Sequence, residues 1–374
     1  MSVVRGQTSR RWATVGAATT MLVAIPVLLA SRPVPTATLS PAAVLAAALR
    51  SAGVPHQGLV QLDASLGLPA LPVISDETTI LSGTTRIRTW WSTPRAWRVD
   101  TLSATGEEAI FADPANGAGE VRQWSFENNT VTQILNEPPV RLPRADDLVP
   151  PQFARRLLRW LGPRDQVLAL DSRRVAGIDA AGARIVPGDD ASTIGRIDVW
   201  VDPGTGLPLE LDVFARGGTR PVLSSRFLDI DLTRPSPGVL SQTLVPTARQ
   251  ETTTEPDLLA RVNSLVDVVL PDRLGSLRTV TGPAAAGLHG VASYGSGLTR
   301  VIVIPLPEQL AADIFDATAT KGTKVHLPGG DITLLSTPLV TLAVVAGNGQ
   351  GYIVAGTIRT GALQAAVTAL LAHP

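Results

Sequence analysis

Cysteine is absent from the 374-residue chain, which excludes disulfides, catalytic thiolates, cysteine-ligated zinc and a lipid-modified cysteine. Charge of one sign is not in excess, because 32 Lys and Arg residues balance 32 Asp and Glu residues. The chain therefore has no net field that would attract nucleic acid or an acidic substrate. Histidine is scarce, and its four residues have no ligand-like spacing: His56, His289, His326 and His373.

Catalytic motifs are also missing. The sequence has no G-x-S-x-G nucleophile elbow, no G-x-G-x-x-G and no P-loop. Glu107 and Glu108 are adjacent in a predicted strand, so they point to opposite faces and do not form a catalytic carboxylate pair. The pair Asp189-Asp190 is typical of a turn, and a single histidine such as His56 is typical of structure rather than catalysis. We predict no catalytic residues, metal or cofactor; a hydrolase with an unrecognised site ranks last among the possible functions.

The N-terminus has the layout of an export signal. Arg5, Arg10 and Arg11 precede an apolar run from Ala13 to Ala30, followed by a Pro-rich segment. The run is about the minimum length that spans a bilayer, and its basic flank places the N-terminus in the cytoplasm. No clear small-x-small cleavage site follows Ala30, which favours an uncleaved signal anchor, with a cleaved signal peptide as the alternative. Either case places the rest of the chain outside the cytoplasmic membrane.

The most regular pattern is "DVWVDPGTGLPLELDVF", residues 198–214. Two alternating runs flank a Pro-Gly-Thr-Gly turn, which predicts a β-hairpin with one apolar face. Similar alternating runs between residues 56 and 134 predict a series of antiparallel strands. Helices are predicted near 41–52, where Ser40-Pro41 forms a start signal, and at 150–162.

A change in pattern divides the chain. The polar stretch 248–256 predicts a linker, and the order of elements after it predicts a small α+β domain with helices on an antiparallel sheet. We therefore expect an N-terminal signal or anchor with a Pro-rich linker (1–38), a first domain (39–250) and a second domain (251–374).

Tryptophan is concentrated in the predicted strands. Trp90, Trp91, Trp97, Trp124 and Trp200 all lie there. Packing in a core is the usual role of such large aromatic side chains, and lining an apolar cavity for a lipid is the alternative. Spacing along the sequence does not separate the two roles.

Three stretches carry a resemblance to a known family: "SLGLPALP", "LSGTTRIRTWW" and "VWVDPGTGLPLELDV". Together with their surroundings, about 40–250, they resemble the LolA-like domain of actinobacterial envelope proteins, whose superfamily includes LolA, LolB and RseB (MucB). The last third of the chain is similar to the C-terminal domain of RseB-type proteins. There "YGSGL", residues 294–298, stands in place of a "YSDGL"-like strand, and the Asp of that pattern is absent from this chain.

The resemblance implies a mainly antiparallel α+β fold: an unclosed β-barrel with a helical lid around an apolar cavity, followed by a smaller RseB C-terminal-like domain. In the family this cavity receives lipoprotein acyl chains. The apolar face of the strands independently needs a cover, and few helices are available to supply it. We predict that these residues line the cavity: Ile87, Trp91, Trp97, Trp124, Val199, Val201, Leu207, Leu209, Leu211 and Val213. The candidate partner contacts are Tyr294, Ser296 and Leu298.

Two functions follow as hypotheses. The first is a membrane-anchored extracytoplasmic protein that binds a lipid or a lipoprotein acyl chain, related to the lipoprotein carriers of the envelope. The second is an RseB-like regulator that binds an anti-sigma factor and so controls an envelope-stress sigma factor. The two are compatible, because a bound lipid could be the sensed signal. No nucleic acid is expected as a partner.

Overall fold

The computed structural model describes residues 34, 39–67, 79–102, 106–113, 121–135, 143–240, 247–254, 268–280, 291–346 and 350–373. Within this part, no helix is long and apolar enough to cross a membrane. The predicted signal or anchor, Ala13 to Ala30, lies outside the described residues.

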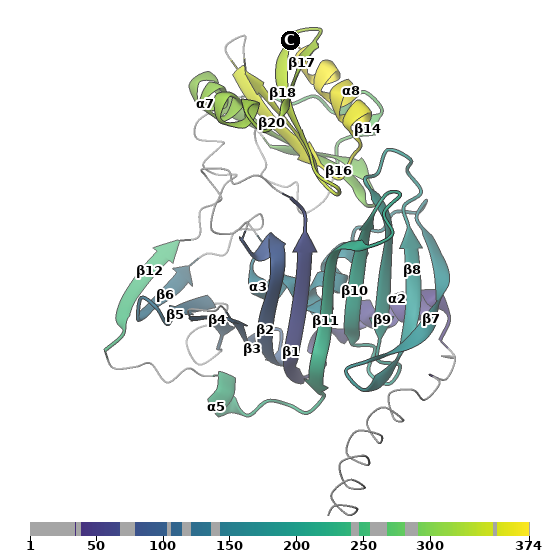
Figure 1. Cartoon of the computed structure of the whole chain (residues 1–374), viewed down its shortest axis with the longest axis vertical. Coiled ribbons are helices and arrows are strands. Elements are labelled where there is room, and N and C mark those ends of the chain that lie inside the picture. The colour runs from purple at the N-terminus through teal and green to yellow at the C-terminus, as the bar shows by residue number, and fades with distance from the viewer. Residues whose placement is uncertain are drawn as a thin grey trace, which may run out of the picture. The chain divides into compact units, whose positions relative to one another are not determined.

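The first architectural feature is an unclosed sheet of twelve strands with the order β12-β6-β5-β4-β3-β2-β1-β11-β10-β9-β8-β7 (Figure 1). Its strands are β1 (His56–Ser65), β2 (Ser82–Thr93), β3 (Ala96–Leu102), β4 (Glu107–Ala112), β5 (Val121–Ser125), β6 (Thr130–Leu135), β7 (Gln166–Val175), β8 (Ile178–Val186), β9 (Ile194–Val201), β10 (Pro208–Ala215), β11 (Pro221–Asp231) and β12 (Arg249–Thr254). Two antiparallel meanders, β1–β6 and β7–β11, join where β1 pairs with β11. The predicted fold class, mainly antiparallel β with few helices and an unclosed sheet, is confirmed.

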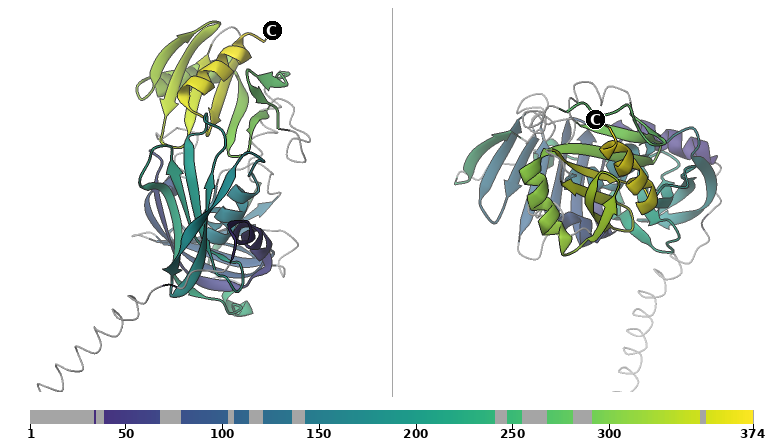
Figure 2. Two further views of the ribbon diagram at one scale, coloured as in Figure 1. Left: turned by 90° about the vertical axis from the view of Figure 1, so that its right-hand side faces the viewer. Right: turned by 90° about the horizontal axis from the view of Figure 1, so that it is seen from above.

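The short helices belong mainly to the connections of this sheet. They are α2 (Pro41–Arg50), η1 (Ser51–Gly53), η2 (Thr79–Leu81), α3 (Ala145–Leu148), α4 (Pro150–Leu158) and α5 (Pro237–Leu240). The Ser40 hydroxyl accepts a hydrogen bond from the Ala43 N–H and so caps α2, as the Ser-Pro start signal predicts. Helix α2 packs on β7, β8 and β9, and α4 packs on β10 and β11. The strands curve around this helical side (Figure 2).

The hairpin predicted at 198–214 is formed by β9 and β10, which pair in antiparallel register with Val199 opposite Leu211 and Ile197 opposite Val213. In its turn, the Asp202 carboxylate accepts hydrogen bonds from the Gly204 and Thr205 N–H groups. This turn chemistry fixes the register, and the register in turn puts Ile197, Val199, Leu211 and Val213 on one face.

The polar stretch 248–256 differs from the prediction of a linker. Residues Arg249–Thr254 form β12, which pairs in parallel with β6 and extends the sheet at its edge. The local sequence pattern does not reveal this strand, because its parallel partner lies about 120 residues earlier in the chain and because a strand at a sheet edge can be polar. The predicted domain boundary at residue 250 falls inside this strand.

The second sheet has six strands in the order β15-β16-β20-β19-β18-β17. These are β15 (Ala292–Ser296), β16 (Thr299–Pro307), β17 (Thr323–Leu327), β18 (Gly330–Ser336), β19 (Thr341–Ala346) and β20 (Gln350–Gly356), with helices α7 (Glu308–Ala319) and α8 (Thr360–Leu371) and a short ribbon β13 (Arg273–Leu274) and β14 (Leu277–Arg278). Helix α8 buries Leu363, Val367 and Leu370 at helical spacing against this sheet. The antiparallel sheet with helices is as predicted for this part of the chain.

Candidate ligand-binding site

The apolar face of the first sheet is continuous across the point where the two meanders join. Paired residues share a face, so Ala183, Val199, Leu211 and Ser225 are aligned across β8, β9, β10 and β11. Val60 continues the face into β1, where it lies between Phe227 and Ile87. One sheet surface therefore collects apolar side chains from both halves of the domain.

Most residues predicted to line the cavity lie together on this face. Their side chains are at most 6 % exposed and belong to one apolar core: Ile87, Trp91, Trp97, Val199, Val201, Leu207, Leu209, Leu211 and Val213. Helix α2 contributes Val44, Leu45 and Ala48 to the same core, and α4 contributes Phe153 and Leu158. The face is thus covered by helices of the chain itself. Each Leu buried in this way contributes about 1.5–3 kcal/mol of apolar burial.

Trp124 does not belong to this face. Ala112 of β4 pairs with both Trp97 and Val121, which places Val121 on the Trp97 face. Trp124 is three residues further along β5 and so points to the opposite side, where it packs edge-on against Phe126. The sequence pattern missed this because "VRQWSF" has no regular alternation.

An aromatic cluster lies at one end of the apolar face. The His56 ring stacks on Trp91 with centroids 6.2 Å apart, and Trp91 stacks on Trp97 at 5.8 Å. Phe227 meets His56 edge-on at 5.8 Å. The Trp91 indole N–H donates to the Ala52 carbonyl, which ties the cluster to η1. Burial, more than the nearby charge of Arg155, lowers the pKa of His56 to about 4, so its ring is neutral at neutral pH.

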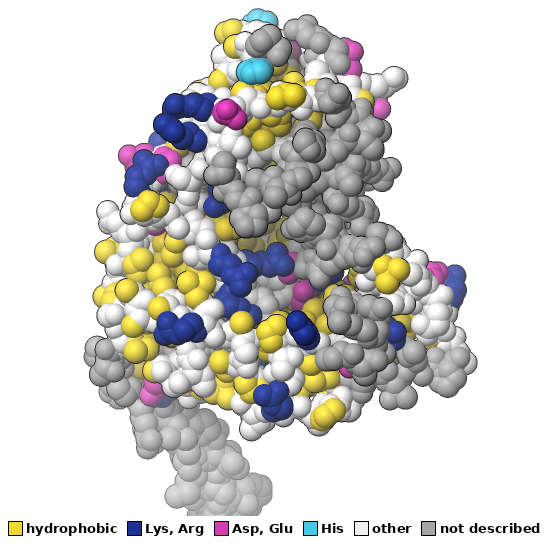
Figure 3. Space-filling view, turned by 180° about the vertical axis from the view of Figure 1, so that it is seen from behind, with side chains coloured by type: hydrophobic (Ala, Val, Ile, Leu, Met, Phe, Trp, Pro, Cys, Tyr) yellow, Lys and Arg dark blue, Asp and Glu magenta, His cyan; other side chains and the backbone are white. Residues whose placement is uncertain are grey.

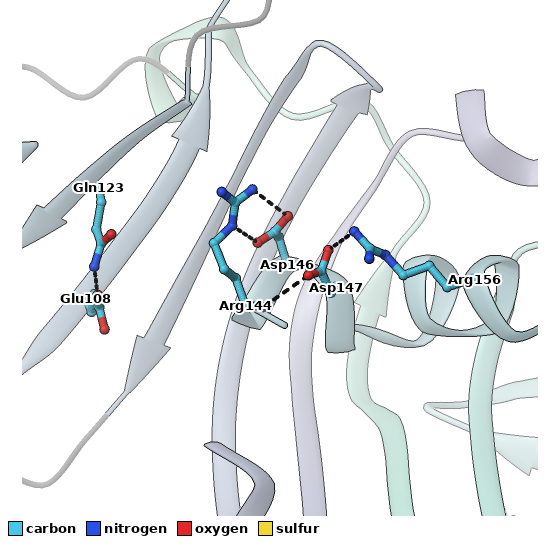
Figure 4. Close-up of polar contacts among 6 residues, drawn as sticks. All are labelled: Glu108, Gln123, Arg144, Asp146, Asp147 and Arg156. Atoms are coloured by element: carbon cyan, nitrogen blue, oxygen red, sulfur yellow. Dashed lines mark hydrogen bonds and ion pairs between the residues drawn. The ribbon is translucent and has the colours of Figure 1, made fainter. Parts of the chain in front are cut away.

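Polar side chains surround α3 on the same side of the sheet (Figure 4). Arg144 pairs with Asp146 at 3.1 Å, and Arg156 of α4 pairs with Asp147. Gln123 of β5 donates a hydrogen bond to Glu108 of β4. Glu108 lies on this side while Glu107 pairs with Arg98 on the other, as the alternation predicts. Each ionic group of this set has a partner, so the set braces α3 and α4.

The predicted partner contacts do not form a surface. Tyr294 is fully buried and its hydroxyl donates to the Pro271 carbonyl, while Leu298 is 1 % exposed and packs in the core of the first sheet. Only Ser296 is exposed, and it accepts a hydrogen bond from Arg164. Tyr294 and Leu298 thus serve packing, because the apolar residues of this strand and turn point inward.

Two cavities among the described residues are lined by residues outside the predicted apolar set. One, of about 70 Å³, is lined by Gly162, Pro163, Arg164, Asp165, Asp189, Ser296 and Gly297. The other, of about 500 Å³, is lined by Thr193, Ser336, Thr341, Arg359, Thr360, Gly361 and Ala362. The described residues contain no cluster of three or more His, Cys, Asp or Glu side chains that could hold a metal ion.

No protein-family model and no curated protein matches this chain. Among solved structures, the MucA/MucB complex of Pseudomonas aeruginosa matches over 88 % of this chain and 97 % of that chain, with 15 % identity and a TM-score of 0.43. The fold resembles that of MucB. A LolA superfamily protein from Nitrosomonas europaea matches over 56 % of this chain and 100 % of its own, with 10 % identity and a TM-score of 0.24. LprF from Mycobacterium bovis matches over 54 % and 99 %, with 10 % identity and a TM-score of 0.27.

The matched structures carry the names to which the sequence resemblance points, MucB (RseB) and the LolA superfamily.

Proposed function

We propose that this protein is an extracytoplasmic binding protein that holds a lipid or lipoprotein acyl chain on the apolar face of the open sheet. The observation that carries the proposal is the continuous apolar face of β1, β2 and β8–β11, covered only by short helices within the described part of the chain. Both covering helices, α2 and α4, lie outside the strand ladder. They can move without breaking a strand pair, whereas a closed core would need the sheet itself to open.

The cover is made largely of small side chains. Helix α2 has the sequence PAAVLAAALR, and only Val44, Leu45 and Ala48 are buried. An acyl chain that displaces it gains about 0.8 kcal/mol for each CH₂ group removed from water. A chain of ten or more carbons therefore offers several kcal/mol to offset the apolar contacts that the helix gives up.

We further propose that the apolar segment from Ala13 to Ala30 anchors the protein in the cytoplasmic membrane, with the binding domains outside. This position would keep the apolar face within reach of membrane lipids. The alternative of a cleaved signal peptide leads to the same compartment without the anchor. Mass spectrometry of the N-terminus of the protein from its own host distinguishes the two.

Lipid extraction tests the binding function directly. Protein purified from its host without detergent is denatured, and the released lipids are identified by mass spectrometry. We expect a lipid in stoichiometric amount, and native mass spectrometry of the delipidated chain should then show a one-to-one adduct with palmitic acid or palmitamide. Protein that releases no lipid and forms no adduct with either compound would show that the proposal is wrong.

The regulator hypothesis stays a prediction. A solved structure of the matched MucB contains MucA as its partner, and this chain has a second sheet that could serve the same end. Pull-down with a single-pass membrane protein encoded beside this gene would decide it. If the first domain alone retains this membrane protein, the partner site does not lie on the second sheet.

A further inference from the structure

Arg155 of α4 is a buried cation without a counter-charge among the described residues. Its side chain is 6 % exposed and makes one hydrogen bond, from Nη1 to the Ser51 Oγ at 3.3 Å. The next residue, Arg156, has instead the buried carboxylate of Asp147 as its partner. A guanidinium has five N–H donors, so most donors of Arg155 have no protein partner among the described residues.

The charge of Arg155 persists at neutral pH. Burial and the nearby charge of Arg159 lower its pKa to about 10, which still leaves the guanidinium protonated. An uncompensated buried charge is costly, and an anion at this position would relieve that cost. On the helical side of the molecule, Lys and Arg side chains gather near the middle of the face (Figure 3).

His56 lies near Arg155 and is polar but neutral, so it carries no charge that competes with an anion. His56 is 1 % exposed, and its Nδ1 lies 3.0 Å from the Val54 carbonyl, to which it donates. The other ring nitrogen, Nε2, is then an acceptor, and it is buried with no partner among the described residues. The buried Thr89 Oγ1, on the same face of the neighbouring strand, also has no partner.

Apolar and aromatic surface extends from this polar group. His56 begins the stack that continues through Trp91 to Trp97, and Phe227 lies against its edge. Phe227 in turn pairs with Val60 on the apolar face of β1. One end of the covered face thus carries a cation and unpaired neutral polar atoms, and the remainder is mainly apolar. This is the layout that an acyl chain with a polar head requires.

We propose that Arg155 anchors the anionic head group, a carboxylate or a phosphate, of the acyl ligand held by the apolar face. The inference rests on the proposed lipid-binding function and adds the charge of the ligand. The anion would take the place of the Ser51 hydroxyl, and the acyl chain would follow the aromatic stack under the displaced helices. Ligand binding and release of the α4–η1 hydrogen bond would therefore be one event.

Palmitate and palmitamide test the proposal, because they share one chain and differ in head-group charge. Affinities are measured by quenching of intrinsic tryptophan fluorescence and by native mass spectrometry on the chain from residue 37. We expect the wild-type protein to prefer palmitate. Arg155→Gln should weaken palmitate binding about tenfold or more and leave palmitamide binding within about twofold.

Arg88→Gln is the matched control. Arg88 is exposed on the same sheet, one residue from Thr89 and therefore on the opposite face. It should bind palmitate like the wild-type protein. Arg155→Lys, which keeps the charge, should retain most of the preference. If Arg155→Gln does not fold, the affinities of the wild-type protein for palmitate and palmitamide test the proposal alone. Equal affinity for the two compounds then overturns it.

The outcomes separate this inference from the proposed function. Binding of both ligands with no effect of Arg155→Gln overturns the anchor and leaves the lipid-binding function intact; binding of neither ligand overturns the function itself.

Sodium acetate alone should not raise the melting temperature, and a rise as large as that from palmitate would indicate a site for free anions and refute the proposal. If dipalmitoyl phosphatidylglycerol competes with palmitate, the anion belongs to a phospholipid; if it does not compete, the anion belongs to a fatty acid. Either result supports an anionic head.

Discussion

At the scale of single residues, the largest departures from ordinary behaviour lie where β1 and β2 meet the helices. His56 is neutral because it is buried, and Arg155 is charged although it is buried. Burial of each group costs free energy in the native state, and both groups lie within one small region of the covered face. Ordinary core packing does not require either group. Their presence is the residue-scale argument that this region has a role beyond packing.

Acid should destabilise the protein through His56. Its pKa is about 4 in the folded state and 6.5 in the unfolded state, so its contribution is full above pH 6.5 and is lost as the pH falls through 4. The lost stability amounts to roughly 3 kcal/mol. Urea unfolding of wild type and His56→Gln between pH 7 and pH 4 should therefore show a smaller acid loss in the variant.

Asp100 provides the control, because its contribution has the opposite sign. Burial raises its pKa to about 6 despite the ion pair with Arg98, so its contribution is full below pH 3.8 and is lost as the pH rises through 6. On acidification, Asp100→Asn should therefore lose more stability than the wild type, whereas His56→Gln should lose less. Identical pH dependence in wild type and His56→Gln would show that the histidine is not held neutral.

At the scale of secondary-structure elements, the decisive contact is between α2 and the β9–β10 turn. Gly206 has a φ of +74°, and a Cβ on it would lie 2.8 Å from the Ala47 Cβ. The turn and the helix therefore approach as closely as their backbones allow. The element that covers the sheet is positioned by a glycine in the same hairpin that supplies much of the apolar face.

Gly206→Ala should loosen the cover. The added methyl group meets both an unfavourable backbone angle and Ala47, so we expect a loss of about 2 kcal/mol in the free energy of unfolding. Hydrogen exchange of the α2 amides, residues 41–50, should accelerate, and palmitate should bind faster if α2 is the lid.

Gly217→Ala separates the two effects. Gly217 has a φ of +76°, and a Cβ on it would have no neighbouring atom within 4 Å, so its substitution carries the backbone strain alone, about 1 kcal/mol. Its α2 exchange rates should equal those of the wild type. Equal exchange in α2 for Gly206→Ala and Gly217→Ala would contradict the proposed contact.

At the scale of the whole molecule, the described chain contains two apolar cores, one beneath each sheet. The division is incomplete, because Leu298 and Leu339 come from the second part of the sequence but pack in the first core. The Thr193 hydroxyl also donates to the Leu339 carbonyl, and Ser192 bridges to Ile358. The two predicted domains therefore share side chains as well as a chain connection.

The fragment of residues 39–254 should fold alone, because it keeps all twelve strands of the first sheet and most of its core. Without Leu298 and Leu339 its free energy of unfolding should fall by at least the ~2–5 kcal/mol typical of one truncated core leucine. Urea unfolding followed by circular dichroism measures this. A fragment ending at residue 250 cuts β12 and should be less stable still. A fragment without a cooperative transition would refute the two-domain interpretation.

The sequence by itself determined most of the antiparallel strands, and the turn and apolar face of the hairpin at 198–214. These features depend on alternation and on Gly, Pro and Asp at turns, and both act over a few residues. It also identified α2 and α4 from their start signals and periodicity. Nine of the ten predicted cavity residues were found on one covered face because period-two alternation assigns a face wherever it is regular.

Only the tertiary structure decided which elements meet. The pairing of β12 with β6 joins segments about 120 residues apart. The face on which Trp124 lies depends on how β3, β4 and β5 pair in succession, starting from Trp97. Helical periodicity places Arg155 at the border of the buried face of α4, and the packing of η1 and α4 on the sheet then buries its charge. Local sequence fixes which way a side chain points relative to its own backbone. What lies opposite that side chain is set by long-range packing, which brings the His56 ring and Arg155 of α4 together at one end of the covered face.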